Sequence, residues 1–245
     1  MSTLVSRPGE AAASSRRIRD VRGFERVVAA AALVVSAGCL TASRFLTPDG
    51  SETREILDAV AANPDRQFGY ALLTYIAGIT MVPAFLAAAR LARTQRPVLA
   101  MIAAGINLVA YMGGATLAVV EVLYLAGAQL PTEQQGAATG LIDEFWSAGM
   151  VGFSAWLFTV GSLAGGVLMG LALRGRIPMV GWLAMAASQP LLFVQWAALP
   201  SDGSGLGLDV AARGLLALGF ACCAVMVLRT PNDDWDVAPH HTRPI

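Results

Sequence analysis

Five ionisable residues near the ends of apolar segments are the first candidates for chemistry. Glu121 stands inside the apolar stretch ATLAVVEVLYLAG, Asp209 and Arg213 stand four residues apart in another, and Asp143 and Glu144 directly precede a third. An i, i+4 spacing places Asp209 and Arg213 on one helix face. We predict that these residues share one depth and that Arg213 bridges Asp209 and Glu121. They would form either an ion-pair network that fixes helix order or a site for a cation or substrate.

A second set of polar residues falls near the middle of two apolar segments. Asn107 and Tyr111 lie four residues apart, on one helix face. Ser188 and Gln189 directly precede Pro190, which removes one helical hydrogen bond. Interrupted helices with polar side chains at mid-depth form substrate sites in many transporters. This set therefore predicts a second candidate binding site.

The composition excludes several familiar chemistries. The only two histidines, at positions 240 and 241, follow the last apolar segment, and the three cysteines lack metal-ligand spacing. This excludes histidine-ligated haem, di-iron and zinc sites within the apolar segments. We predict no cofactor, no metal site and no enzymatic activity. One enzymatic alternative stays open, in which acids such as Glu121 and Asp143 act with a bound metal ion.

The elements that must position these residues are membrane-spanning helices. The chain is 56% hydrophobic and 14% charged, whereas a soluble domain has about 25% charged residues. Its apolar residues form blocks near the ~20 residues that cross a bilayer. We therefore predict an all-α polytopic membrane protein with a six-helix transmembrane bundle. The predicted spans are about 27–43, 68–92, 98–126, 145–173, 177–199 and 206–228.

The placement of arginine predicts the orientation of this bundle. All 17 basic residues are arginine, and 13 of them fall on the inner side if the N-terminus is inside. Because Arg is enriched in cytoplasmic loops, the sequence predicts an N-in/C-in topology. The chain then consists of a basic cytoplasmic tail at 1–26, a six-span membrane domain at 27–228 and a cytoplasmic tail at 229–245. The polar ends of both tails are expected to be disordered.

The first outer loop is expected to contain a short helix. Ser51 can cap a helix that runs to about Ala62, and Asn63 followed by Pro64 ends it. The apolar residues of this segment lie on one side of the helix. Such a helix would lie on the outer membrane surface or cover the bundle.

Small residues in the fourth span favour close helix packing. Gly161 and Gly165 form one small-xxx-small pair, and Gly166 and Gly170 form another. This packing surface would serve either a contact within the chain or a homo-oligomer or protein partner. The predicted partners are therefore the lipid bilayer and this homo-oligomer or protein partner. We predict no nucleic-acid partner, since the neutral net charge gives no indication of one.

The stretch ILDAVAANPDRQFGYALLTYIAGITMVPAFLAAARLAR contains an outer helix, a long span and an arginine-bearing inner turn. In this layout the chain resembles the uncharacterised six-span integral membrane proteins of bacteria, common in actinobacteria, that carry a domain of unknown function. The resemblance implies a six-helix bundle in the bacterial plasma (inner) membrane. It carries no catalytic residues.

Two classes of function follow from these patterns. The favoured class is a non-enzymatic scaffold, partner or sensor in the plasma membrane. The alternative is a small transporter with a midplane polar site and an outward-facing acidic vestibule. The transporter alternative predicts a polar cavity that joins Gln189 to the residues around Glu121 and Arg213.

Overall fold

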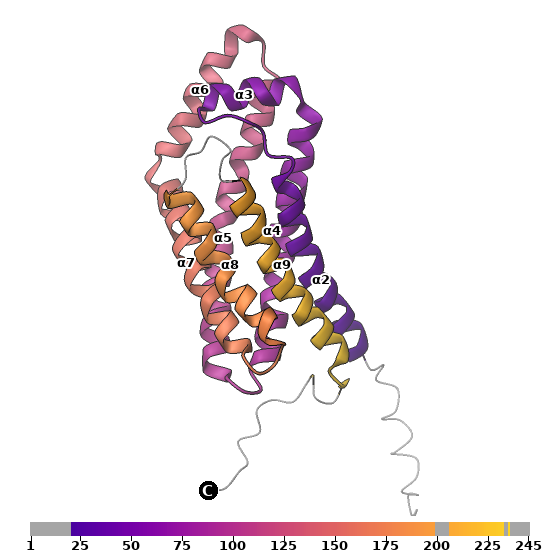
Figure 1. Ribbon diagram of the computed structural model, residues 1–245. Helices are drawn as coiled ribbons and strands as arrows, with labels where there is room; N and C mark the ends of the chain where they lie inside the picture. The colour runs from indigo at the N-terminus through magenta and orange to yellow at the C-terminus, as the bar shows by residue number, and fades with distance from the viewer. Residues whose placement is uncertain (1–20, 199–205, 233–234, 236–245) are drawn as a thin grey trace, which may run out of the picture.

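The computed structural model describes residues 21–198, 206–232 and 235. The elements in this part of the chain are all α-helices, with no strands (Figure 1). Five helices are long and apolar enough to cross a membrane by length and composition. They are α2 (Arg22–Arg44), α4 (Pro64–Ala92), α5 (Pro97–Ala128), α7 (Gly149–Leu173) and α9 (Leu206–Arg229). The all-α prediction is thus confirmed for the described residues, with five candidate spans.

A sixth long helix, α8 (Met179–Ala198), occupies the fifth predicted span. Its apolar stretch Met179–Gln195 is shorter than those of the other five helices. At 1.5 Å per residue that stretch covers about 25 Å, and the 20 residues of the whole helix cover about 30 Å, the thickness of the hydrocarbon core. The sixth span therefore stays a prediction, although the helix itself lies where the sequence places it.

The six long helices form a closed ring. In chain order, each of α2, α4, α5, α7, α8 and α9 contacts the next, and α9 returns to contact α2. Successive helices run in opposite directions (Figure 1). Helix α4 also contacts α7 and α9, so it lies toward the centre of the ring.

The main core lies between these helices and contains many small side chains. Leu33, Phe85 and Phe220 are fully buried in it, and the Phe85 and Phe220 rings meet edge to face at 5.4 Å. Alanines such as Ala88 and Ala103 are buried near the turn that joins α4 to α5. Because small residues allow close backbone approach, α4 and α5 pack tightly in this half of the bundle.

Arginine side chains join neighbouring helices near the α4–α5 turn. Arg96 Nη1 donates to the Leu171 carbonyl of α7 at 2.9 Å, and Arg176 Nε donates to the Leu91 carbonyl of α4 at 3.2 Å. The last carbonyls of a helix lack partners within it. These arginines therefore satisfy helix C-termini, in addition to the topological role expected from the sequence.

Two short helices, α3 (Thr53–Ala62) and α6 (Thr132–Ser147), cover the other end of the bundle, which we call the α3/α6 end (Figure 1). The short helix predicted to end near Ala62 is confirmed as α3, although its N-cap is Glu52 rather than Ser51. Hydrogen bonds from the Ser51 amide, the Ser51 hydroxyl and the Glu52 amide hold the pKa of the Glu55 carboxyl below its ordinary value.

Helix α6 was not expected, and it changes the position of two predicted site residues. The backbone at Ala148 is extended, which separates α6 from α7. The sequence predicts that Asp143 and Glu144 open the fourth span. That prediction is wrong, because both residues belong to α6. Ile142 of α6 is buried in a small cluster with Leu57 of α3. Two glycines within α6 lower its helix propensity, which hides it in the sequence.

The predicted disordered tails fall mostly outside the described residues. Of the C-terminal tail, residues 230–232 and 235 are described, and Trp235 is 4% exposed and packs in the main core. Its carbonyl accepts a hydrogen bond from Arg90 Nε at 3.2 Å, and the Arg90 guanidinium lies 4.7 Å from the centre of the indole ring. The expectation of disorder is therefore wrong at this residue, because a cation–π contact and burial fix it to the bundle.

The four glycines of the predicted small-xxx-small pairs lie in α7 at contacts within the chain. A Cβ atom at Gly161 or Gly165 would lie within 2.7 Å of side chains of α5. At Gly170 it would lie 2.7 Å from backbone atoms of α8, and at Gly166 it would meet another α8 side chain. The small-xxx-small pairs therefore serve the ring itself, and a homo-oligomer would need a different surface.

Candidate functional site

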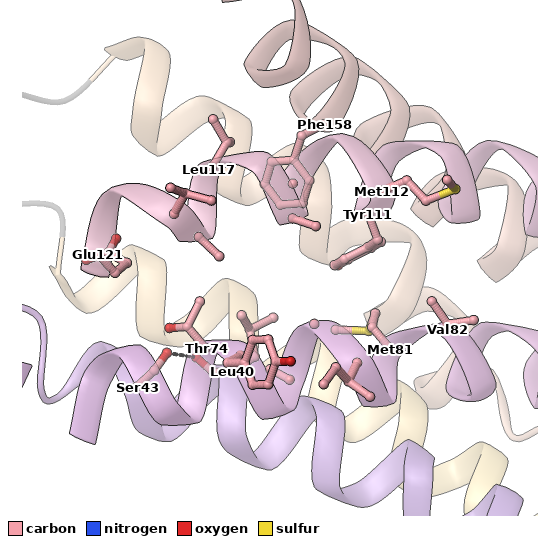
Figure 2. Close-up of a pocket in the computed structure, with 18 of the residues that line it drawn as sticks. Leu40, Ser43, Thr74, Met81, Val82, Tyr111, Met112, Leu117, Glu121 and Phe158 are labelled. Carbon is pink, nitrogen blue, oxygen red and sulfur yellow. Dashed lines mark hydrogen bonds between the residues drawn. The ribbon is translucent and has the colours of Figure 1, made fainter. Parts of the chain in front are cut away.

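A cavity of about 590 Å³ lies between α4 and α5 in the half of the bundle near the α3/α6 end (Figure 2). Its volume falls in the range of about 300–1,000 Å³ that is typical of ligand pockets. Leu40 and Ser43 of α2, Phe158 of α7 and Arg213 of α9 complete its walls. Apolar side chains form most of the lining, so the cavity suits a largely apolar ligand.

The cavity is elongated along the helix axes. Its α5 lining runs from Tyr111 to Val122, which is about 16 Å at 1.5 Å per residue. Figure 2 shows Glu121 at one end, with Tyr111, Met112 and Val82 toward the other. The length is about half of the ~30 Å hydrocarbon core of a bilayer.

The side of the bundle between α4 and α5 forms the opening of the cavity. Tyr75 and Ile79 of α4 and Met112 and Val122 of α5 all line it, and each is more than half exposed. These residues recur at helical spacing along both helices, so they border one long opening. A ligand would therefore enter laterally, from the surroundings of the helices.

Aromatic rings close the end of the cavity far from Glu121. The Tyr111 ring lies 5.4 Å from both the Phe85 ring and the Phe158 ring. A Cβ atom at Gly114 would lie 2.7 Å from the Phe158 ring, so glycine is what allows this ring to pack against α5. Met81, fully buried, also contributes to this wall.

Glu121 lies at the polar end of the cavity, held by neutral partners. Gln67 Nε2 donates to the Glu121 carboxylate and to its backbone carbonyl, both at 3.1 Å. The Tyr70 hydroxyl also interacts with this carboxylate. The Thr74 hydroxyl lines the same region and is buried without a hydrogen-bond partner in the described part of the chain. The polar group that this end presents to the cavity is therefore the Glu121 carboxylate.

Arg213 lines the same cavity and has one of its two predicted partners. Its Nε donates to Asp209 at 2.9 Å, and its Nη1 donates to the Leu40 carbonyl at 3.2 Å. Arg44 of α2 pairs with the other oxygen of Asp209. The Asp209 half of the prediction is confirmed, whereas the bridge to Glu121 is absent from the described contacts. The reason is geometric, because Glu121 and Arg213 lie on different walls with the cavity between them.

The remaining outer acids lie outside the cavity. Asp143 accepts a hydrogen bond from the Thr53 hydroxyl of α3 at 2.6 Å, and Glu144 is exposed on α6. Within the described residues, no group of three or more His, Cys, Asp or Glu side chains is placed to hold a metal ion. Of the five predicted outer residues, only Glu121 and Arg213 line the cavity.

Three of the four predicted midplane residues serve helix packing. Asn107 Nδ2 donates to the Ala103 carbonyl at 2.8 Å, and the Ser188 hydroxyl donates to the Met185 carbonyl at 2.9 Å. Both side chains are buried. Each therefore bonds to the backbone of its own helix rather than to an open site.

Gln189 is buried against Gly166 of α7, where its Cγ occupies the space of a missing Cβ. It does not line the cavity, whereas Tyr111 does. The transporter alternative expected a cavity joining Gln189 to Glu121, and the cavity from Glu121 leads to Tyr111 instead. That alternative therefore loses the contact on which it depended.

Gln67 and Tyr70 are site residues that the sequence did not indicate. The predicted second span began at residue 68, which left Gln67 in a loop, whereas α4 begins at Pro64. Asn63 caps this helix by accepting from the Arg66 amide at 3.2 Å. The Asn-Pro pair is also a helix start signal, so reading it as such would have placed Gln67 at the depth of Glu121.

Comparisons of the chain with protein-family models, with curated proteins and with solved structures find no match. The function is therefore inferred from the geometry of the cavity.

Proposed function

We propose that this protein is a multi-pass membrane protein that binds a lipid-like amphiphile in the cavity between α4 and α5, as a non-enzymatic sensor or partner. The observation that carries the proposal is a laterally open, mostly apolar cavity with the Glu121 carboxylate at one end and the Arg213 guanidinium in one wall. An amphiphile has the same division, with an apolar chain and a polar headgroup. Lateral entry between two helices is the direct route for a molecule dissolved in the bilayer.

The same proposal includes six spans with both termini inside the cell. All 20 residues of α8 cover about 30 Å, enough for a span. The arginine-bearing turns at 93–96 and 174–176 lie at one end of the ring, and α3 and α6 lie at the other. Under the positive-inside rule the α3/α6 end faces outward. The cavity then opens to the outer leaflet, whose ~15 Å thickness matches its length.

The resemblance to six-span bacterial proteins supports the bacterial plasma membrane as the location.

Cysteine labelling tests the orientation, with an impermeant maleimide applied to intact cells and the three native cysteines replaced by alanine. Thr94 and Gln134 are exposed at opposite ends of the bundle. We expect Gln134→Cys to be labelled in intact cells and Thr94→Cys only after permeabilisation. The reverse pattern would contradict the orientation.

A cavity-filling substitution tests the proposed binding. Ala118 lines the cavity, whereas Val109, on the same helix, is exposed outside it. We expect Ala118→Phe to reduce lipid retention at least tenfold, because the phenyl ring occupies the space of the ligand. Val109→Phe should retain about as much lipid as the wild type, near one molecule per chain. The measurement is quantitative mass spectrometry of lipid bound to the purified protein. Equal retention by both variants would contradict the proposal.

A further inference from the structure

We infer that the cavity selects an amphiphile with a zwitterionic headgroup, whose amine cation lies at Glu121 and whose anionic group lies at Arg213. This inference rests on the proposed function, since it names the headgroup of the same ligand. The juxtaposition that carries it is a carboxylate and a guanidinium on different walls of one cavity.

Glu121 is the acceptor for the cation. Its hydrogen bonds come from the neutral groups of Gln67 and Tyr70, and no arginine forms an ion pair with it among the described residues. A carboxylate in an apolar environment is stabilised most by an opposite charge with hydrogen-bond donors. An amine on the ligand supplies that charge from within the cavity.

Arg213 is the donor for the anion. It shares one buried carboxylate, Asp209, with Arg44, so two guanidinium groups face a single negative charge. A guanidinium has five N–H donors, and the hydrogen bonds of Arg213 to Asp209 and Leu40 use its Nε and Nη1. Arg213 lines the cavity, whereas Arg44 does not. The surplus positive charge is therefore presented to the ligand through Arg213.

Both charged side chains line one cavity. Tyr70 of α4 lines the same cavity, and its hydroxyl interacts with the Glu121 carboxylate. A ligand with only an anionic headgroup would meet the Glu121 carboxylate, and one with only a cationic headgroup would meet the guanidinium of Arg213. Such like-charge contacts disfavour either ligand. A headgroup with both charges satisfies both walls.

Binding of three lipids with identical dioleoyl chains tests the inference. They are phosphatidylethanolamine, which is zwitterionic, phosphatidylglycerol, which is anionic, and a trimethylammonium-propane lipid, which is cationic. We expect the delipidated wild-type protein to bind phosphatidylethanolamine at least tenfold more tightly than the other two, because each charged hydrogen bond contributes about that factor or more. Native mass spectrometry with lipid titration measures the three dissociation constants.

Two pairs of variants locate the effect. Glu121→Gln should weaken the binding of phosphatidylethanolamine about tenfold or more and should leave the binding of phosphatidylglycerol unchanged or tighter. Its control is Glu144→Gln, at an exposed position of α6, which should change the affinity for neither lipid. Arg213→Gln should also weaken the binding of phosphatidylethanolamine. Arg44→Gln is its matched control, because it removes the other partner of Asp209 without touching the cavity.

The outcomes separate this inference from the proposed function. If phosphatidylglycerol or the cationic lipid binds as tightly as phosphatidylethanolamine and Ala118→Phe still abolishes binding, the headgroup inference is overturned and the proposed function stands. If no lipid binds in a manner sensitive to Ala118→Phe, the proposed function fails. The order of affinities in the wild-type protein decides the inference even if a charge variant does not fold.

Discussion

Replacing Asp209 by alanine is expected to destabilise the protein by about 3–5 kcal/mol, the cost of leaving buried ion-pair partners without their counter-charge. The Asp209 side chain is 2% exposed and pairs with Arg213 of its own helix and with Arg44 of α2. Its loss leaves two guanidinium groups close together with no carboxylate between them. The junction of α2 with α9 should weaken first, because Arg44 and Asp209 join those two helices.

The measurement is the free energy of unfolding in detergent micelles, followed by circular dichroism. Asp58→Ala is the control, because Asp58 also pairs with an arginine at i, i+4 spacing but is exposed on α3. Exposed pairs contribute about 0–1 kcal/mol, so the control should stay within that range. If Asp209→Ala destabilised the protein no more than Asp58→Ala, the arginine pair would not hold α2 to α9.

Gly170→Ala is expected to destabilise the protein by about 1–3 kcal/mol, the usual cost of overpacking. A Cβ atom there would lie 2.7 Å from the Ala186 amide nitrogen and from the Trp182 carbonyl oxygen of α8. Both are backbone atoms, which cannot rotate away as a side chain can. Helices α7 and α8 would have to separate.

Gly152→Ala is the matched control on the same helix. A Cβ atom at Gly152 meets nothing within 4 Å, and alanine is a better helix former than glycine by about 1 kcal/mol. The two substitutions should therefore change stability in opposite directions, or the control should leave it unchanged. Equal thermal midpoints for Gly170→Ala and the wild type would show that α7 and α8 do not pack as closely as described.

The long helices could be predicted because their signal is local. Each apolar block is bounded by arginine, proline or polar residues, and every predicted bound lies within five residues of the end of the corresponding helix. Helix α6 gave no comparable signal, since it contains two glycines and buries only a few side chains, such as Ala138 and Ile142. Its stability depends on contacts with α3 and α5, which sequence periodicity does not encode.

The candidate site could be predicted in part. The shared helix face of Tyr111 and Glu121 does line one cavity, because helical spacing determines which residues point the same way. The partner of Arg213 was harder, since depth along a helix does not say which helices are neighbours. The ring places α2 beside α9, so Arg44 reaches Asp209, while α5 lies across the cavity from Arg213.

Gln189 and Trp235 also show that the sequence does not reveal which distant residues become neighbours in the fold. A polar residue beside a proline at mid-span has the pattern of a transport site, but Gly166 on the neighbouring helix makes room for Gln189 and removes it from the cavity. Trp235 stands in a polar tail, and only the position of Arg90 in space makes its burial favourable. In both cases the deciding residue is distant in sequence.

A structure of the full-length protein in lipid nanodiscs, determined by cryo-electron microscopy with a bound antibody fragment, tests the central claim most directly. We predict elongated density in the cavity between α4 and α5, with its polar end beside Glu121 and its chain extending toward Tyr111. Helices α4 and α5 packed together along residues 70–82 and 111–122, with no space between them, would contradict the account.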